Sequence, residues 1–281
     1  MLLNEAIDKY VKYVMVTRSE GTLKYLNGKI GIIRRYLGNA TCKDIDTDMI
    51  LDFIIAQQKR NIDIGNKTIN KYIQTIKQVL KYSCKINLQF DKLPEIKKII
   101  EIIPESIILL IFNYYKNNQI NIIYQRNYIM FRLLNETGLR ITELLHLKLN
   151  DFDFSSLTIL VKKTKTNTER YVFFSKETYL LIHKYILTAK LKNHIFVDFI
   201  TGDILAVYSA ESIGQRLRKK LGINQSISPH KWRHTFATRF TKRNGNMEVL
   251  RQIMGHTSLK TTQKYLHINK ETLHEEYFRI N

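Results

Sequence analysis

The sequence predicts a mainly α-helical protein with two domains, the second of which contains a small antiparallel sheet. Apolar residues recur at helical spacing through most of the 281 residues, which is typical of packed helices. One stretch, residues 157–174, alternates in the manner of a β-hairpin. Two of the three prolines, Pro94 and Pro104, bracket a charged stretch that divides the chain. We therefore expect a helical domain at 1–92, a linker at 93–104 and a mixed α+β domain at 105–281.

The first domain is predicted to be all-α, with helices near residues 3–16, 22–37, 47–59 and 66–84. The last of these is the clearest, because its apolar residues form one stripe: Ile69, Tyr72, Ile73, Ile76 and Leu80. Four lysines fall on the opposite face, namely Lys67, Lys71, Lys81 and Lys85. This face is a candidate for contact with a phosphate backbone, and an ordinary solvated surface is an equally good interpretation.

The second domain is predicted to be helical on both sides of its hairpin. Helices run from the linker to about residue 147, and LTILVKK (157–163) and ERYVFF (169–174) then form two strands around the polar turn TKTNT. Gly255 marks a helix end, since glycine readily adopts the left-handed conformation found there. The later helices are expected near 176–190, 209–221, 231–243, 246–254 and 259–266.

The charge of the chain indicates a polyanionic partner. It contains 45 Lys and Arg against 25 Asp and Glu, and the formal charge of +20 is spread over both halves. Because 44% of the residues are hydrophobic, this is a folded basic protein, and nucleic acid is the leading partner. No apolar run approaches the roughly 18 residues that span a bilayer, and MLLNEAIDKY lacks the features of a secretion signal. We expect a cytoplasmic protein with no membrane partner.

The residues with distinctive chemistry gather in four segments of the second domain. These are ETGLRITELLHL with Arg140 and Glu143, TKTNTER with Lys165, SPHKWRHTFAT with His230 and Arg233, and GHTSLKTTQKYLHI with His256 and Tyr265. Each residue alone has a structural explanation, such as a surface ion pair, a hairpin lysine, a capping histidine or a core tyrosine. Together they supply the groups that nucleophilic attack on a phosphodiester requires. Cys42 and Cys84 form no CxxC pair, so a zinc site is not predicted.

These four segments resemble the motifs of the tyrosine recombinase (phage integrase) family, in the family's order. The matches are TGLR-x-x-E, a hairpin lysine before ERYVF, HKWRHTFAT and MGHTSLKTTQKY. Trp232 and Phe173 stand where leucine and proline are usual, and neither is a catalytic position. The resemblance implies a SAM-like helical core-binding domain, then a catalytic domain that ends in an oligomerisation tail. The chain looks like a minimal, two-domain, Xer-like member.

The resemblance also implies a role for each residue. Tyr265 is the nucleophile, and Arg140 and Arg233 stabilise charge on the scissile phosphate. His230 assists proton transfer, and His256 donates a hydrogen bond to the same phosphate.

Two further positions have implied roles. Lys165 protonates the departing 5′-oxygen, although Lys162 and Lys163 are neighbouring alternatives. Glu143 supports the arginines. Neither a metal nor another cofactor is implied.

The implied partner is double-stranded DNA with paired recognition half-sites. A homotetramer, or a mixed tetramer with a related second recombinase, would exchange strands through a Holliday junction. The biological role stays open between chromosome dimer resolution, inversion and mobile-element integration or resolution. Two other functions remain as alternatives, a type IB topoisomerase and a DNA-binding protein that has lost catalysis. The terminal segment 266–281 either contacts a neighbouring protomer or covers the chain's own core.

Overall fold

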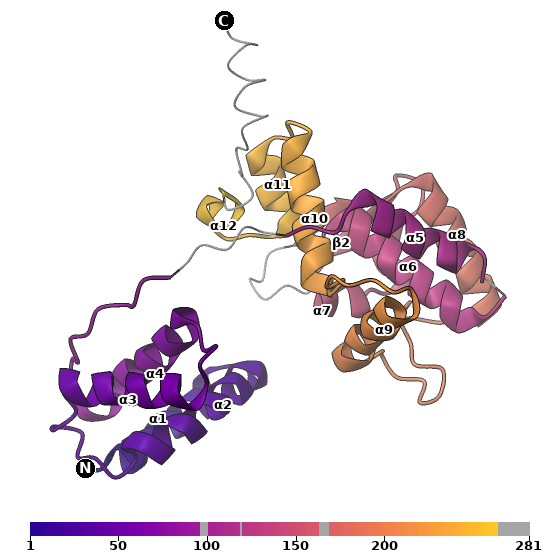
Figure 1. The fold of residues 1–281 in the computed structure, drawn as a ribbon. Helices are drawn as coiled ribbons and strands as arrows, with labels where there is room; N and C mark the ends of the chain where they lie inside the picture. The colour runs from indigo at the N-terminus through magenta and orange to yellow at the C-terminus, as the bar shows by residue number, and fades with distance from the viewer. Residues whose placement is uncertain (96–100, 119, 163–168, 264–281) are drawn as a thin grey trace, which may run out of the picture. The chain divides into compact units, whose positions relative to one another are not determined.

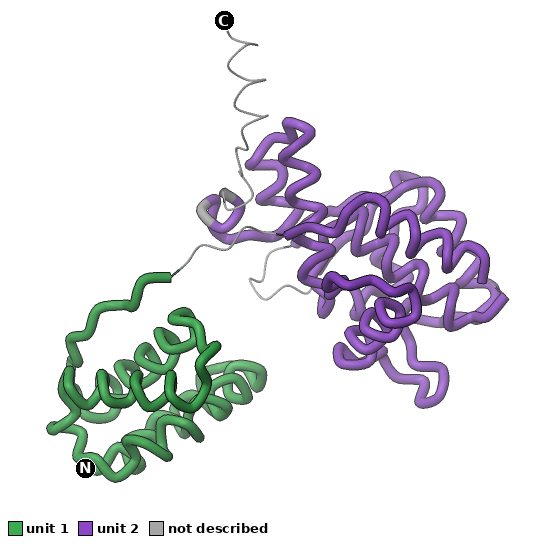
Figure 2. Tube along the Cα trace, viewed as in Figure 1, with its two compact units in different colours: residues 1–98 green, residues 99–281 purple. Residues whose placement is uncertain are grey.

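The chain divides into two compact units, residues 1–98 and 99–281 (Figure 1, Figure 2). The computed structural model describes residues 1–95, 101–118, 120–162 and 169–263. Each unit has its own hydrophobic core. Among the described residues, no helix combines the length and the apolar character needed to cross a membrane.

The first unit consists of helices packed around one core, as the apolar periodicity predicted. Its helices are α1 (Leu3–Thr17), α2 (Glu20–Leu37), α3 (Thr47–Arg60) and α4 (Asn66–Cys84). The predicted stripe of α4 is buried along its whole length, and Ile69 and Ile76 are fully enclosed. The four lysines of the opposite face, Lys67, Lys71, Lys81 and Lys85, are all exposed. The amphipathic pattern of α4 therefore places its lysines on the surface of this unit.

The residues next to the change of unit are held by specific hydrogen bonds. The Asn70 side chain of α4 donates to the carbonyl oxygen of Leu93 at 2.9 Å and accepts from the Leu93 amide at 2.9 Å. The amide of buried Ile103 donates to the Thr235 hydroxyl of the second unit at 2.9 Å. The first and last parts of the predicted linker at 93–104 thus pack against the unit on their own side.

The second unit is mainly helical and contains a three-stranded antiparallel sheet of order β1-β2-β3. The strands are β1 (Phe152–Asp153), β2 (Thr158–Val161) and β3 (Arg170–Phe173). Strands β2 and β3 form the predicted hairpin, in which Ile159 pairs with Val172 and Val161 with Arg170. The short strand β1 was not predicted. It extends the sheet by pairing Phe152 with Ile159.

Helices, joined by loops, account for most of the remaining described residues of the second unit. They are α5 (Glu105–Lys116), α6 (Ile122–Thr137), α7 (Ile141–Leu145), the 3-10 helix η1 (Leu149–Asp151), α8 (Lys176–Ala189), α9 (Val207–Lys220), α10 (Pro229–Lys242), α11 (Met247–Met254) and α12 (Leu259–Gln263). The predicted helices near 176–190, 209–221, 231–243 and 246–254 are confirmed to within two residues at each end, and α12 begins at the predicted residue.

Helix α10 is anchored in this core by Trp232, which is fully buried. Its ring centroid lies 5.6 Å from that of Phe131 on α6 and 6.3 Å from that of Phe112 on α5. Aromatic packing of this kind removes a large apolar area from water and limits the rotation of a helix about its axis. The anchoring fixes the orientation of the next residue, Arg233.

Candidate active site

Arg140 lies at a helix start that is created by a glycine turn. Helix α6 ends at Gly138, whose φ of +62° is in the left-handed region, and Arg140 is the N-cap of α7. The Glu143 carboxylate accepts the Arg140 backbone N–H at 2.9 Å and its Nη1 at 2.9 Å. The Glu143 side chain is only 3% exposed, whereas that of Arg140 is 30% exposed. Glu143 therefore holds Arg140 through both its backbone and its side chain, while the Arg140 guanidinium remains partly exposed to solvent.

Arg170 of β3 also binds both oxygens of the Glu143 carboxylate. Its Nη2 donates to Glu143 Oε2 at 2.7 Å and its Nη1 to Oε1 at 3.2 Å, so the pair is bidentate. Both side chains are buried. Such fork-to-carboxylate geometry gives strong, directional hydrogen bonds.

The Glu143 carboxyl has a lowered pKa. Burial by itself would raise the pKa, because a low-dielectric surrounding disfavours the charged form. The hydrogen bonds and charge of Arg170, followed by those of Arg140, outweigh burial and hold the pKa below its usual range. Glu143 is therefore an anion at neutral pH.

Three arginines converge on the C-terminal end of α11. The last carbonyl groups of a helix lack intrahelical donors and carry partial negative charge, so they attract cations. Successive carbonyls each accept a guanidinium from a different element of the fold: Ile253 from Arg170 Nε at 2.7 Å, Met254 from Arg233 Nη2 at 2.6 Å, and Gly255 from Arg140 Nη2 at 3.2 Å. We call Arg140, Arg170 and Arg233 the arginine cluster.

Arg233 is the most deeply buried member of the cluster. It is 4% exposed and projects from α10, and its Nη1 donates to the carbonyl oxygen of Gly138 at 2.6 Å. Because Nη2 contacts the end of α11, one guanidinium joins the ends of two helices. A Cβ added at Gly138 would lie 2.4 Å from Phe236 Cδ1, so the close approach of α10 to this turn requires glycine.

Gly255 allows α11 to end against the cluster. Its φ is +60°, which confirms the predicted helix end. A Cβ at this position would lie 2.9 Å from Arg170 Nη1. Glycine thus satisfies both the backbone conformation and the close approach of the Arg170 guanidinium.

His256 follows directly and is buried beside the next helix. Its Nδ1 lies 2.9 Å from the Thr262 hydroxyl of α12, which is itself fully buried. Its carbonyl oxygen accepts Arg251 Nη1 at 2.9 Å. These contacts fix the imidazole between α11 and α12, the short helix that leads toward Tyr265.

His230 occupies the exposed first turn of α10, one turn before Arg233. Its ring stacks on His234, with centroids 6.0 Å apart. Within the described residues, no hydrogen bond joins the His230 ring to the arginine cluster. His230 and Arg233, three residues apart on α10, are therefore one exposed and one buried side chain.

Two predicted catalytic residues, Lys165 and Tyr265, lie outside the described residues, as does the alternative Lys163. The other alternative, Lys162, follows β2 and forms an ion pair with Asp151 at 3.0 Å. Among the residues that are described, no three His, Cys, Asp or Glu side chains gather as the ligands of a metal would.

The segment ERYVFF predicted a strand, but its sequence alone indicated no role for Arg170. Alternation along β3 places Arg170 and Val172 on the buried face, whereas Tyr171 and Phe173 are exposed. A charged residue that falls on the buried face of a strand indicates a specific buried role. This sequence does not reveal which face of β3 is buried, because both faces carry large apolar residues.

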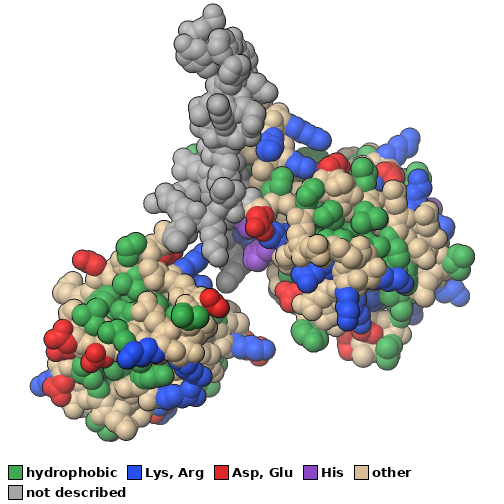
Figure 3. Space-filling view, viewed as in Figure 1, with side chains coloured by type: hydrophobic (Ala, Val, Ile, Leu, Met, Phe, Trp, Pro, Cys, Tyr) green, Lys and Arg blue, Asp and Glu red, His purple; other side chains and the backbone are tan. Residues whose placement is uncertain are grey.

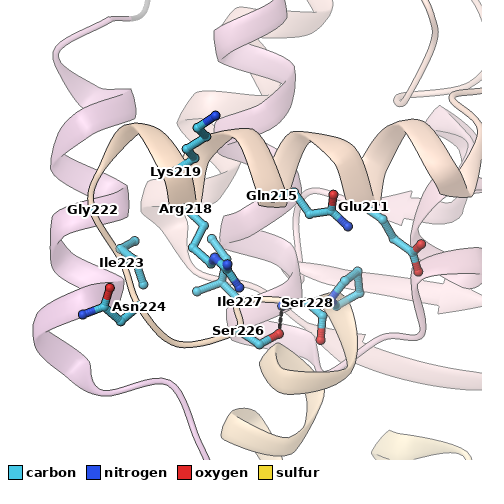
Figure 4. Close-up of a pocket in the computed structure, with 12 residues that line it drawn as sticks. Glu211, Gln215, Arg218, Lys219, Gly222, Ile223, Asn224, Ser226, Ile227 and Ser228 are labelled. Atoms are coloured by element: carbon cyan, nitrogen blue, oxygen red, sulfur yellow. Dashed lines mark hydrogen bonds between the residues drawn. The ribbon is translucent and has the colours of Figure 1, made fainter. Parts of the chain in front are cut away.

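A cavity of about 760 Å³ lies between α9 and the loop at residues 222–228 (Figure 4). Figure 4 shows Arg218 extending from α9 toward Ser226 and Ile227 of this loop. No member of the arginine cluster lines the cavity. The candidate site is therefore separate from this hollow. Lys and Arg side chains are visible on the surfaces of both units (Figure 3).

Comparisons with known proteins identify relatives of this chain. The tyrosine recombinase XerA of Saccharolobus solfataricus is 35% identical over 214 residues, which are 75% of this chain and 67% of that protein. XerC of Leptospira interrogans is 36% identical over 158 residues, or 54% of this chain and 50% of that protein. A probable integrase/recombinase of Acholeplasma phage L2 is 26% identical and covers 100% of this chain and 98% of its own.

Solved structures share the fold. The Tn1549 transposon integrase, in complex with a circular intermediate DNA, matches with a TM-score of 0.83 at 19% identity and covers 100% of both chains. The XerH recombinase bound to a palindromic difH substrate matches with a TM-score of 0.76 at 20% identity, covering 96% of this chain and 82% of that one. The sequence pattern of the phage integrase family itself matches residues 101–272. The chain therefore belongs to the phage integrase family of tyrosine recombinases.

Proposed function

We propose that this tyrosine recombinase cuts and rejoins DNA through a covalent bond to Tyr265. The phenolic oxygen attacks the scissile phosphorus, the bond from phosphorus to the 5′-oxygen breaks, and a 3′-phosphotyrosyl intermediate with a free 5′-hydroxyl results. Because the phosphodiester energy is retained in the covalent bond, rejoining needs no nucleotide cofactor. Attack by a 5′-hydroxyl of a second site completes strand exchange.

The arginine cluster is the observation that carries this proposal. A phosphoryl-transfer transition state spreads negative charge over the non-bridging oxygens, so fixed cationic donors accelerate it. Arg140 keeps a partly exposed guanidinium while Glu143 and the end of α11 hold it in place. Arg233 is oriented by two carbonyl groups. Both forks are held in place before substrate arrives, which lowers the cost of ordering them in the transition state.

The proton transfers are assigned to the remaining residues. A phenol has a pKa of about 10, so attack at neutral pH requires a proton acceptor, and we assign that role to His230. Lys165 protonates the leaving 5′-oxygen. His256, whose ring is fixed by Thr262, donates a hydrogen bond to the phosphate. Glu143 acts as a positioning residue, and no metal ion takes part.

The unit of residues 1–98 is assigned to DNA binding, through the exposed lysines of α4. Its partner is a duplex with paired half-sites, on which four protomers assemble and form a Holliday junction. The terminal segment links neighbouring protomers in this assembly. Because the substrate is DNA in the cell interior, we place the protein in the cytoplasm.

Replacement of Tyr265 by phenylalanine tests the nucleophile. The variant Tyr265→Phe loses only the phenolic oxygen, so it should bind DNA normally and form no SDS-resistant adduct on a nicked suicide substrate. Wild-type protein should form the adduct, also in excess EDTA. An adduct from the phenylalanine variant would assign the nucleophile to another residue, and an EDTA block reversed by Mg²⁺ would contradict the metal-free reaction.

A type IB topoisomerase uses the same covalent chemistry, so a second assay separates the two activities. A recombinase joins strands from two cognate sites, whereas a topoisomerase relaxes one supercoiled duplex. Recombinant products from a two-site plasmid support the proposal. Relaxation without recombinants would favour the topoisomerase.

A further inference from the structure

The exposed face of α4 has a regular chemical pattern. Five exposed residues at successive spacings of four and three form a single stripe along the helix: Lys67, Lys71, Gln74, Gln78 and Lys81. The exposed C-cap residue Lys85 follows the stripe. Two amides therefore have two lysines before them, and Lys81 and Lys85 after them. No acidic residue interrupts the stripe.

Gln78 lies where two surface hollows meet. One hollow, of about 360 Å³, is lined by α1, α2 and α4 and includes Arg18, Lys29 and Gln74. The other, of about 620 Å³, continues toward the end of α4 and includes Lys81 and Lys85. Both hollows are lined by Tyr10 and Gln78, so they adjoin at these two residues, and lysines line each of them.

The side chain of Gln78 is held in position by α1. The Tyr10 hydroxyl donates to Gln78 Oε1 at 3.3 Å. Tyr10 is in turn packed against the rings of Tyr13 and Tyr82, whose centroids lie 6.2 and 5.7 Å away. An amide oxygen has two lone pairs, so Gln78 Oε1 retains an acceptor site and its NH₂ group two donors.

This combination fits the major groove of duplex DNA. A glutamine amide can pair with the N6 amino group and N7 of adenine at once, whereas lysines contact phosphates without regard to sequence. Gln74 and Gln78 are separated by about 6 Å along the helix axis, which is close to two base-pair steps of roughly 3.4 Å. Lys71 and Lys81 are about 15 Å apart along the axis, a span comparable with the groove width of about 12 Å.

We propose that Gln74 and Gln78 read adenine bases in the major groove of each half-site, with the flanking lysines of α4 on the phosphates. This inference rests on the proposed function, because it requires the first unit to bind DNA. It makes the two glutamines specificity-determining residues, and Tyr10 a positioning residue for Gln78.

Selection of binding sites from a randomised duplex DNA library tests the assignment with the full chain. Wild-type protein should enrich sequences with adenine at two positions about two base pairs apart. The isosteric variants Gln74→Met and Gln78→Met should each lose discrimination at one of these positions, by about 5- to 100-fold. Gln78→Arg should change the preference at its position to guanine, which arginine recognises through O6 and N7.

Two control variants separate base recognition from general binding. Gln58→Met alters an exposed glutamine of α3 outside the stripe and should leave the selected sequence unchanged. Lys81→Met should weaken binding to all sequences alike and reduce the salt dependence by about one charge. Thermal melting of each variant establishes that it is folded.

The inference is overturned if both methionine variants select the same sequences as wild type, since the stripe is then only a solvated or phosphate-contacting face. It is also overturned if Lys81→Met changes the selected bases as much as Gln78→Met does. The suicide-substrate adduct of Tyr265 distinguishes this failure from failure of the proposed function. An adduct with unchanged base preference refutes only the glutamine assignment, whereas no adduct and no enriched sequence refute both.

Discussion

Arg170 and Glu143 form a buried, bidentate ion pair beneath Arg140, with Nη2 to Oε2 and Nη1 to Oε1 distances of 2.7 and 3.2 Å. The exposed fractions of the two side chains are 6% and 3%. A buried pair of this kind contributes modestly when compared with an apolar replacement of both partners, but removal of one partner leaves a desolvated charge. Arg170 thus balances the buried charge of Glu143 and orients the carboxylate that Arg140 contacts.

Replacement of Arg170 by methionine should destabilise the protein by about 3–5 kcal/mol, because Glu143 then remains buried with one arginine instead of two. Denaturant unfolding measures this loss. The control Arg239→Met removes the more exposed pair of Arg239 and Glu105 and should cost less than about 1 kcal/mol. Equal losses from the two variants would contradict the importance of the buried pair. Well below its melting temperature, Arg170→Met should still cleave more slowly than the control.

The Glu143→Gln variant should reveal a pH-dependent contribution to stability. Because the pKa of Glu143 is lowered in the folded protein, its contribution is complete above the unfolded value of about 4.3 and is lost as the pH falls through the folded pKa. The difference in unfolding free energy between wild type and Glu143→Gln should therefore be largest at neutral pH and shrink below pH ~4. Unfolding curves at several pH values measure it. A difference that does not depend on pH would show that the carboxylate charge is not what matters.

A methyl group at Gly255 should disturb both stability and catalysis. Gly255→Ala places a side chain at φ +60° and a Cβ 2.9 Å from Arg170 Nη1. Gly202→Ala is a matched control, since it has φ +77° with no atom within 4 Å of the added Cβ. The control should cost only the backbone strain of about 1–2 kcal/mol and cleave at the normal rate. Gly255→Ala should cost more and cleave at least about tenfold more slowly, because the shift of Arg170 displaces its partners. Similar cleavage rates for the two variants would refute this coupling.

Lys165→Ala should cleave an ordinary site more slowly by a factor on the order of 10²–10⁴, the usual effect of losing a general acid. Replacement of the scissile 5′-bridging oxygen by sulfur should restore the rate, because a thiolate leaves without a proton. Arg140→Ala should not recover, since its defect concerns the non-bridging oxygens. If Lys165→Ala remains slow on the sulfur substrate, the proton donor is Lys163, Lys162 or a histidine. Lys162 is already paired with Asp151.

Truncation after His267 should impair assembly without preventing binding to a single half-site. The removed segment includes Leu273, Tyr277 and Ile280, which share one side if the segment is helical. Gel-shift titrations should show a normal half-site affinity and reduced cooperativity on a full site, and recombination should fall sharply. Normal cooperativity would exclude an assembly role. A truncated protein that fails to fold would favour contact of the tail with its own core.

Local patterns in the sequence determined the fold class, most helix bounds and the family. The apolar stripe from Ile69 to Leu80 predicted α4 because helical periodicity needs only neighbouring residues. Gly255 predicted the end of α11 because its left-handed conformation is a property of glycine itself. The motifs around Arg140, Arg233 and His256 indicated the chemistry through residue type and order.

The tertiary structure alone decided how these residues are held. Strand β1 pairs only two residues, Phe152 and Asp153, which is too short a segment for an alternating pattern. The role of Arg170 depends on which face of β3 is buried, and both faces carry large apolar side chains. The arginine cluster forms because the carbonyl groups at the end of α11 attract guanidinium groups from β3, α10 and the start of α7. The Arg140 bond to Gly255 joins residues 115 positions apart in the chain. A pattern among sequence neighbours cannot specify such contacts, because they arise only when the packed core brings distant segments together.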